Sequence, residues 1–300
     1  MGRASGIQAT FEAPGQAERW RRRLIPAFRA LRGNPNMLIG VVIMVAATII
    51  AIFAPLISTD NPEWAEPAIR LQTPSSSNWF GTDQFGRDVF SRVIHGSQLS
   101  LKVGGLVAGF TMLFGTSIGI VTGYYKTLDN IVMRFMDGLM AFPSFLLAIA
   151  LVAILGPSVQ NVVIAITVVE SPRVVRIVRG STLSLRERQF VEAALAIGAG
   201  PPRILYRHIF PNLIAPLLVQ GTFVFAVAIL SEAGLSFLGA GVPPVVPSWG
   251  NMMGESKIYF QIAAWTVFFP GLMLSLTVLG ANLIGDGLRD TLDPRLRRTG

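Results

Sequence analysis

Long apolar runs separated by short charged stretches dominate the pattern along this chain of 300 residues. A helix of roughly 20 apolar residues is long enough to cross the hydrocarbon layer of a bilayer, which is about 30 Å thick. The first half of the chain holds three such runs, Met37–Ser58, Val103–Tyr125 and the stretch from Asp137 to Glu170. The third run is too long for one crossing, and glycine, proline and serine at 156–158 favour a turn that divides it.

The same pattern predicts three further crossings in the second half. The fourth, roughly Val162–Val178, is the most polar because it contains a glutamate and two arginines, and we expect it to end at the interface near Pro172. The fifth and sixth lie between Arg207 and Glu232 and between Lys257 and Asp286. Backbone polar groups in lipid must pair within their own segment, so all six crossings are expected to be helices. The fold class predicted is an all-α membrane protein.

Composition agrees with this reading. Hydrophobic residues make up 51% of the chain and charged residues 14%, whereas a soluble domain carries roughly 25% charged residues. The absence of cysteine excludes disulfides and thiolate metal sites, and the two histidines, His95 and His208, are far apart in sequence. No metal site is therefore expected. The net charge of +8 does not indicate a nucleic-acid partner, because the arginines lie between apolar runs.

The distribution of basic residues predicts the orientation. Six crossings place both termini on one side of the membrane, and 20 of the 25 lysines and arginines fall on that side. Short loops rich in lysine and arginine remain in the cytoplasm, so both termini are predicted to be cytoplasmic. The expected segments are a cytoplasmic tail at 1–36, a first crossing at 37–58, an extracytoplasmic loop at 59–100, a transmembrane core at 101–285 with a cytoplasmic loop at 179–211, and a cytoplasmic tail at 286–300.

The first tail is expected to include a short interfacial helix, because four apolar residues recur there at helical spacing among arginines (Trp20, Leu24, Phe28 and Leu31). The first apolar run is too long for the core of a cleaved signal peptide, so it is interpreted as an uncleaved helix.

The extracytoplasmic loop becomes compact near its end. Gly81 and Gly86 suit tight turns, and the acidic and basic side chains around them could lock those turns by hydrogen bonds. From Asp88 onward the apolar spacing predicts an amphipathic helix that leads into the second crossing. The loop shows no carboxylate pair or nucleophile–base arrangement, and an ordinary structured loop remains an alternative.

The cytoplasmic loop predicts a helix–turn–helix that projects from the membrane. Helix-forming residues dominate 185–197, Gly198 is placed to end that helix, and prolines at 201 and 202 suit the start of a second short helix that runs to Pro211. Three apolar side chains could anchor a partner and two alanines could let it approach closely (Phe190, Val191 and Ile197; Ala193 and Ala194). From the residues alone, a docking surface and a solvated loop are equally supported.

This loop resembles the EAA loop of ABC importer permeases. The family pattern is E-A-A-x3-G, then nine residues, then I-x-L-P; here Glu192-Ala193-Ala194 precedes Gly198, and the spacing to Pro211 matches. His208 and Phe210 replace the isoleucine and leucine of the pattern, which affects the subfamily rather than the class.

Three more stretches, Phe80–Arg92, Met133–Pro143 and Leu235–Gly250, are similar to the dipeptide/oligopeptide/nickel permease family, in the family's order. The resemblance covers roughly Pro35 to Arg295. It implies the C-type permease of peptide importers, with six crossings in the type I ABC importer permease fold, in the bacterial inner membrane.

The resemblance also implies partners. Family members pair with a homologous second permease subunit, two cytoplasmic ATPases and an extracytoplasmic substrate-binding protein. The chain lacks the G-x4-G-K-[ST] phosphate loop, so it is expected to be non-catalytic and to bind no cofactor, with ATP and Mg²⁺ held by the ATPases. The residues implicated in ATPase coupling are Glu192, Ala193, Ala194, Gly198 and Pro211, and those of the extracytoplasmic family motif are Gly81, Thr82, Asp83, Gly86, Arg87 and Asp88.

Several membrane residues invite separate hypotheses. Pro143 and Pro172 are expected to kink their helices and could contribute to gating. Carboxylates inside a membrane are functional candidates, but snorkelling of Asp137 and Glu170 to the interface, or their pairing with the nearby Arg134 and Arg173, is the favoured interpretation. Trp249 and Trp265 could be interfacial anchors.

The loop 239–254 could face the binding protein or cap the pathway, and its sequence favours neither. Two alternatives to peptide import remain. The first is import of nickel or another small solute by the same family. The second is an ion-coupled secondary transporter, which is disfavoured because the centres of five crossings carry no charge.

Overall fold

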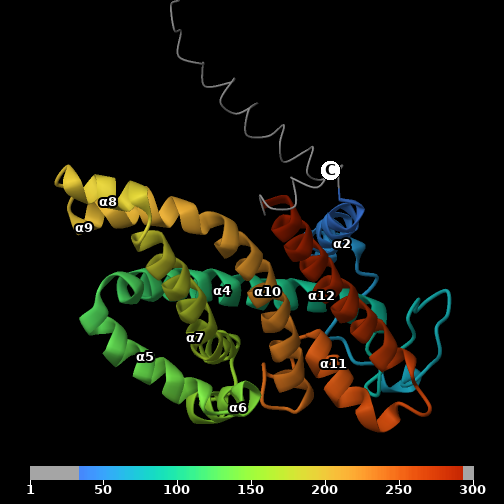
Figure 1. Cartoon of the computed structure of the whole chain (residues 1–300). Coiled ribbons are helices and arrows are strands. Elements are labelled where there is room, and N and C mark those ends of the chain that lie inside the picture. The colour runs from blue at the N-terminus through green and yellow to red at the C-terminus, as the bar shows by residue number, and fades with distance from the viewer. Residues whose placement is uncertain (1–33, 293–300) are drawn as a thin grey trace, which may run out of the picture.

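The computed structural model describes residues 34–292, and the predicted interfacial helix in the first tail lies outside them. The described residues form helices, with one long loop between α3 and α4 that contains the short helix η1 (Figure 1). Their bounds are α2 Pro35–Ile52, α3 Ala54–Ile57, η1 Pro67–Ile69, α4 Val89–Tyr124, α5 Lys126–Met140, α6 Ser144–Leu155, α7 Val159–Arg186, α8 Gln189–Ala196, α9 Pro201–Ile204, η2 Leu205–Ile209, α10 Phe210–Phe237, α11 Trp249–Ser256, η3 Lys257–Tyr259 and α12 Trp265–Leu292. In this part of the chain the one extended pairing is an isolated bridge between Thr82 and Asp88.

Four helices are long and apolar enough to cross a membrane: α2, α4, the continuous run of α9, η2 and α10 from Pro201 to Phe237, and α12. A fifth candidate is the pair α5 and α6, which bends by 91° at its break. The molecule is therefore an all-helical membrane protein with four or five candidate spans among the described residues. The sequence-based prediction of six crossings is not reached. Helix α7 is long enough to cross a membrane, but it is too polar to count as a candidate span.

The two prolines lie differently in their helices. Helix α7 continues through the buried Pro172 to Arg186, beyond the interface at which the fourth crossing is predicted to end. One missing backbone donor does not end a helix whose other side chains pack closely on both sides. Pro143 does not kink a continuous helix; it precedes α6 at the sharp bend after α5. The turn predicted at 156–158 is confirmed between α6 and α7.

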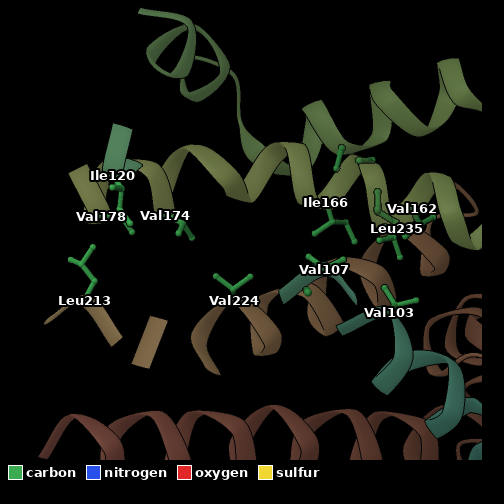
Figure 2. Packing of buried hydrophobic residues seen from close by; sticks show 14 of the residues in the cluster. Val103, Val107, Ile120, Val162, Ile166, Val174, Val178, Leu213, Val224 and Leu235 are labelled. Atoms are coloured by element: carbon green, nitrogen blue, oxygen red, sulfur yellow. The ribbon is translucent and has the colours of Figure 1, made fainter. Parts of the chain in front are cut away.

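The core of the molecule is the parallel contact between α4 and α7. A stripe of glycines on α4 lets α7 approach so closely that a methyl group at Gly115 would lie 2.6 Å from Val174, and one at Gly119 would lie 2.7 Å from Val178. Small residues at four-residue spacing are the usual means of close helix packing in membranes. Figure 2 shows valines and isoleucines of α4 and α7 packed against one another. Val224 of α10 belongs to the same cluster.

A second close contact joins the first and last described helices. A methyl group at Gly40 of α2 would lie 2.7 Å from the backbone oxygen of Gly280 of α12. At the ends of these helices, Asn34 caps α2 and also donates a hydrogen bond to Asp290 at 3.3 Å. The start of α2 and the end of α12 therefore lie together, on the side of the molecule where α8 and α9 also project (Figure 1).

The approach to α10 contains a short π-helical segment, η2. The backbone N–H of Phe210 bonds to the oxygen of Leu205, five residues back rather than four. Pro211 follows directly and has no N–H to donate, so a wider turn relieves the clash that its ring would otherwise cause. The second short helix predicted after Gly200 thus runs on into the fifth predicted crossing instead of ending at Pro211.

Candidate functional site

The projecting element at one end of the molecule is built by α8, a sharp turn and α9. Gly198 has φ +81°, a conformation that side chains disfavour. Its N–H bonds to the oxygen of Leu195 at 2.9 Å, and the N–H of Ala199 bonds to Ala194 at 3.0 Å. These two bonds form a Schellman motif that ends α8. The predicted helix end at Gly198 is confirmed.

The two faces of α8 differ. Val191 and Ala194 are buried and pack in the core cluster that includes Ile204 and Ile209. The outward face exposes Glu192, Ala193 and a set of large apolar side chains on α8 and the following turn (Phe190 41%, Leu195 50% and Ile197 86% exposed), and Tyr206 of η2 is 79% exposed. Large apolar side chains that are exposed together on a projecting element indicate a surface that binds another protein.

Two of the predicted docking residues therefore have a different role. Val191 and Ala194 face inward, so neither can contact a partner directly, and the small Ala194 instead lets α8 lie close to the rest of the chain. Phe190 and Ile197 are available as anchors. Gly198 and Pro211 are exposed, Gly198 at the turn and Pro211 on the first turn of α10.

The projecting element is tied to the bundle by α7. Arg186 at the end of α7 donates a hydrogen bond to the backbone oxygen of Tyr124 at 3.0 Å, where α4 ends. A cation is favourable at this position because the last carbonyl groups of a helix carry partial negative charge. The end of α7, which leads into α8, is therefore fastened to the end of α4.

Ion pairs also join α7 to α5. Arg179 pairs with Asp129 through both nitrogens of the guanidinium edge, and Arg176 pairs with Asp137 at 2.7 Å. The expected pairing of Asp137 with Arg134 is therefore wrong. The pairing of Glu170 with Arg173 is confirmed at 3.8 Å. Spacing along the sequence suggested the neighbour on the same helix for Asp137, but α7 packs beside α5 and offers a better placed arginine.

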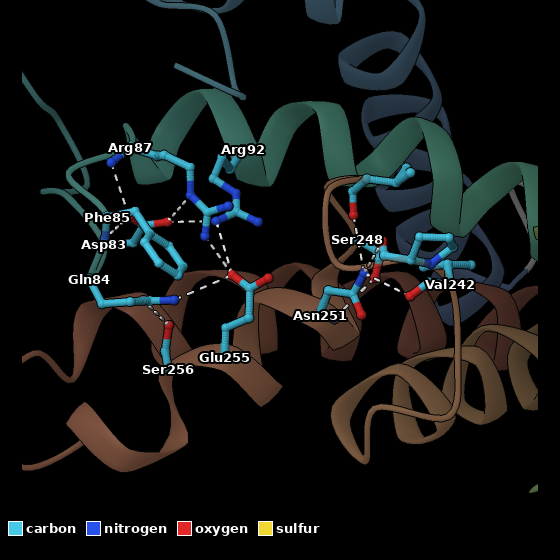
Figure 3. Close-up of polar contacts among 12 residues, drawn as sticks. Asp83, Gln84, Phe85, Arg87, Arg92, Val242, Ser248, Asn251, Glu255 and Ser256 are labelled. Carbon is cyan, nitrogen blue, oxygen red and sulfur yellow. Dashed lines mark hydrogen bonds and ion pairs between the residues drawn. The ribbon is translucent and has the colours of Figure 1, made fainter. Parts of the chain in front are cut away.

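At the opposite end, the extracytoplasmic motif closes around Asp83. One carboxylate oxygen accepts backbone N–H bonds from Phe85 at 2.8 Å and Arg87 at 2.9 Å. The other accepts bonds at 2.6 Å from the side chains of Arg87 and Arg92. Both arginines also reach Glu255 of α11, at 2.5 and 3.3 Å (Figure 3). The motif thus fastens the loop, the start of α4 and α11 to one another.

The rest of the motif supports the same turns. Asp88 caps α4 by accepting from the N–H of Ser91 at 2.7 Å, and it also accepts from Thr59 and Asn78. Gly86 has φ +76°, and a methyl group there would lie 1.9 Å from the backbone oxygen of Glu66. Thr82 hydrogen bonds to the backbone of Ile69 and Gln72. Gly81 has φ +73°. The predicted locking of turns by charged groups is confirmed.

The loop 239–254 packs inward. Trp249 is fully buried and donates to the backbone oxygen of Val93 at 3.0 Å, so it is not an interfacial anchor. Asn251 donates to three backbone oxygens of the loop, at 3.0 to 3.3 Å (Figure 3). The indole N–H of Trp265 likewise donates a hydrogen bond to the backbone oxygen of Thr82, at 3.2 Å. The loop therefore closes over the outer ends of α4 and α10.

Two carboxylates with structural partners escaped sequence reasoning. Glu255 is the second acceptor for the arginines of the motif, and Glu232 is fully buried in α10 where it accepts from Ser236 at 2.9 Å and Ser100 at 3.3 Å. An acidic residue beside an apolar run was the one available signal, and it does not reveal the partner. Among residues 34–292, no three His, Asp or Glu side chains come together as a metal site would require.

Comparison with protein families gives a match over more than half of the chain, including nearly all of its second half. The family described as "Binding-protein-dependent transport system inner membrane component" matches residues 115–298.

Curated relatives agree with this match. The chain is 48% identical over 272 residues to the "Dipeptide transport system permease protein DppC" of Alkalihalophilus pseudofirmus, covering 90% of each chain. It is 52% identical over 270 residues to the "Probable peptide ABC transporter permease protein y4tQ" of Sinorhizobium fredii, covering 90% of this chain and 92% of the relative. It is 44% identical over 225 residues to the "Glutathione transport system permease protein GsiD" of Pectobacterium atrosepticum, covering 75% of each.

Among solved structures, the fold is similar to a chain of the MetNI methionine ABC transporter in an inward-facing conformation. The TM-score is 0.54 at 18% identity, over 67% of this chain and 97% of that chain. A second crystal form of the same transporter gives a TM-score of 0.53. At this identity the likeness concerns the fold alone, which is that of an ABC importer permease.

Proposed function

Since this chain belongs to the family of binding-protein-dependent transport system inner membrane components, we propose that it forms half of the passage of a peptide importer and receives mechanical force at α8. The chain is a multi-pass component of the inner membrane and the non-catalytic part of its ABC transporter. A system of this kind works with an ATPase and a substrate-binding protein. The proposal adds a homologous second permease subunit, two ATPase subunits that hold ATP and Mg²⁺, and a specific point of contact.

The observation that carries the proposal is the outward face of α8. It presents exposed apolar side chains beside Glu192 and Ala193, on an element held rigidly by its Schellman turn and by the contact of Arg186 with α4. Closure of the two ATPases on ATP would shift α8, and α7 would carry that shift into the bundle. Force transmitted in this way favours one of two helix arrangements over the other.

The proposed topology has six crossings and cytoplasmic termini. It counts the bent pair α5 and α6 as one crossing and α7 as another. The contact between Asn34 and Asp290 supports it, because it keeps the described ends of the chain on one side, together with α8. The basic residues of the sequence concentrate on this same side.

Peptide is the proposed solute because the relatives described above are permeases of dipeptide, peptide and glutathione transport systems. The test is uptake of labelled Ala-Ala by vesicles that contain the complete importer with its ATPases and binding protein. ATP-dependent uptake is expected. Uptake of Ni²⁺ without uptake of any short peptide would contradict the peptide assignment, and uptake driven by an ion gradient without ATP would contradict the mechanism.

The contact itself can be tested separately with Ile197→Ser. This side chain is 86% exposed and supports little of the chain's own packing, so the variant is expected to fold and to pair with the second permease subunit while retaining less ATPase on purification. Leu56→Ser is the control, because Leu56 is 81% exposed at the other end of the molecule. Equal ATPase recovery and equal uptake in the two variants would contradict the docking role.

A further inference from the structure

The solvent exposure of one face of α7 changes along the length of the helix. In its first half, the side that packs inward includes Val162 and Ile166, both buried. Seven and eleven residues after Ile166, close to the same angular position on a helix of 3.6 residues per turn, lie Arg173 and Ile177. Arg173 is 49% exposed and Ile177 39% exposed. Arg176, also 49% exposed, flanks them. This face of α7 is therefore buried in its first half and partly exposed in the half that leads to α8.

Lipid is a poor covering for this open face. At 1.5 Å per residue, Arg173 lies about 21 Å from the start of α7, inside a layer about 30 Å thick. A charged side chain at that depth is costly unless it reaches water. Side chains on a helix point toward its N-terminus, which for α7 is away from the cytoplasm, so snorkelling to the nearer surface runs against this direction. Water or another polypeptide must therefore cover the face.

The guanidinium of Arg173 is only partly neutralised by its neighbours. Its contact with Glu170 is 3.8 Å, beyond hydrogen-bond distance, and its other neighbour is the ring of Phe223 at 5.4 Å. Arg176, by contrast, is hydrogen bonded to Asp137 at 2.7 Å. Arg173 thus keeps donors that can turn toward the open side, and the planar fork of a guanidinium fits a carboxylate well.

From this geometry, and resting on the proposed function and orientation, we propose that Arg173 lines the cytoplasmic half of the passage and transiently binds the terminal carboxylate of the moving peptide. Ile177 lies one turn farther on and borders the same space. The opposite exposed face of α7, which includes Ile164, is apolar around a hollow that it shares with phenylalanines on α4 and α5, and it takes no part.

The absence of cysteine in the chain makes thiol labelling a direct test. Ile177→Cys is introduced into the complete importer in proteoliposomes and treated with membrane-impermeant thiosulfonate reagents, one anionic and one cationic. The introduced thiol is expected to react, and to react several-fold faster with the anionic reagent. Adding Arg173→Gln should bring the two rates together, whereas Arg173→Lys should preserve the preference. The control, Ile164→Cys, should react slowly with both reagents.

Protection distinguishes a carboxylate site from a general positive potential. Ala-Ala at millimolar concentration is expected to slow labelling of the Ile177→Cys importer, whereas Ala-Ala with an amidated C-terminus is not expected to slow it. This difference between the two peptides should vanish when Arg173→Gln is added. An unreactive thiol in the Ile177→Cys variant, equal rates for both reagents, or equal protection by both peptides would overturn the inference. Normal labelling in an importer that takes up no peptide with ATP would instead contradict the proposed function and leave the anion site standing.

Discussion

Arg92 and Asp83 form an ion pair of 2.6 Å in which the two side chains are only 2% and 4% exposed. Asp83→Ala removes one of the two carboxylates that Arg92 and Arg87 contact and releases two backbone N–H groups. Removing one partner of a buried pair costs about 3–5 kcal/mol, and Glu255 offsets only part of this cost because its contact with Arg92 is longer, at 3.3 Å. We expect a clear fall in the melting temperature of the purified subunit in detergent.

Glu63→Ala is the matched control for this prediction, because Glu63 is an exposed acidic residue of the same loop. Its melting temperature should equal that of the wild type. If Asp83→Ala melts like the control, the motif around Asp83 is not what holds the loop to α4 and α11.

The backbone of Gly86 supplies a second prediction about the same loop. A methyl group there would meet the backbone oxygen of Glu66 at 1.9 Å, and φ is +76°. A left-handed conformation alone costs roughly 1–2 kcal/mol for a residue with a side chain, and the backbone oxygen cannot move aside without opening the turn. Gly86→Ala should therefore expose the loop to limited proteolysis, while Gly138→Ala, which has open space around it, should not.

The sequence was sufficient for the elements whose signals are local. Apolar run length located the long helices, and Gly198 and Asp88 marked a helix end and a helix start through their own backbone and side-chain chemistry. The sequence did not reveal the contacts between residues far apart in the chain. Nothing in the spacing shows that Glu255 completes the cluster around Asp83, or that Asp137 lies beside Arg176 rather than Arg134.

Burial was the other quantity that sequence could not supply. Ala193 and Ala194 are identical in chemistry and adjacent in the motif, yet one is exposed and the other packs in the core. Trp249 likewise has the composition of an interfacial anchor but lies fully buried against Gly96. Pro172 was expected to kink its helix where the fourth crossing ends, and α7 continues past it to Arg186 with packing against α4 on either side.

The close contact of α4 and α7 predicts that Gly119 cannot be enlarged. A single added carbon would lie 2.7 Å from Val178 and 2.8 Å from the backbone oxygen of Val175. Overpacking of a well-packed core typically costs about 1–3 kcal/mol, and leucine adds more than one carbon. Gly119→Leu should lower the melting temperature and the yield of the subunit. Gly105→Leu on the same helix has open space and should be tolerated; equal losses in both would argue against the packing explanation.

Substitution of Gly198 tests whether α8 acts on a partner rather than on its own chain. Open space surrounds Gly198, and φ is +81°. In Gly198→Asp, the left-handed conformation costs about 1 kcal/mol, and a negative charge near the last turn of α8 opposes the helix dipole by about 0.3–1 kcal/mol. These costs are too small to unfold the bundle, so the subunit should still assemble in membranes. The carboxylate instead projects into the space of the proposed ATPase, and ATP-dependent uptake should be abolished.

The matched control places the same charge two residues away. Gly200 has ordinary backbone geometry and is the N-cap of α9, a position where aspartate is favourable because its side chain can accept the backbone N–H of Arg203, the first donor after the two prolines. Gly200→Asp should therefore assemble and retain most of its transport. Both variants are compared by co-purification of the subunits and by uptake in vesicles. Normal uptake by Gly198→Asp, or an equal loss in Gly200→Asp, would mean that the turn after α8 does not transmit force from the ATPase.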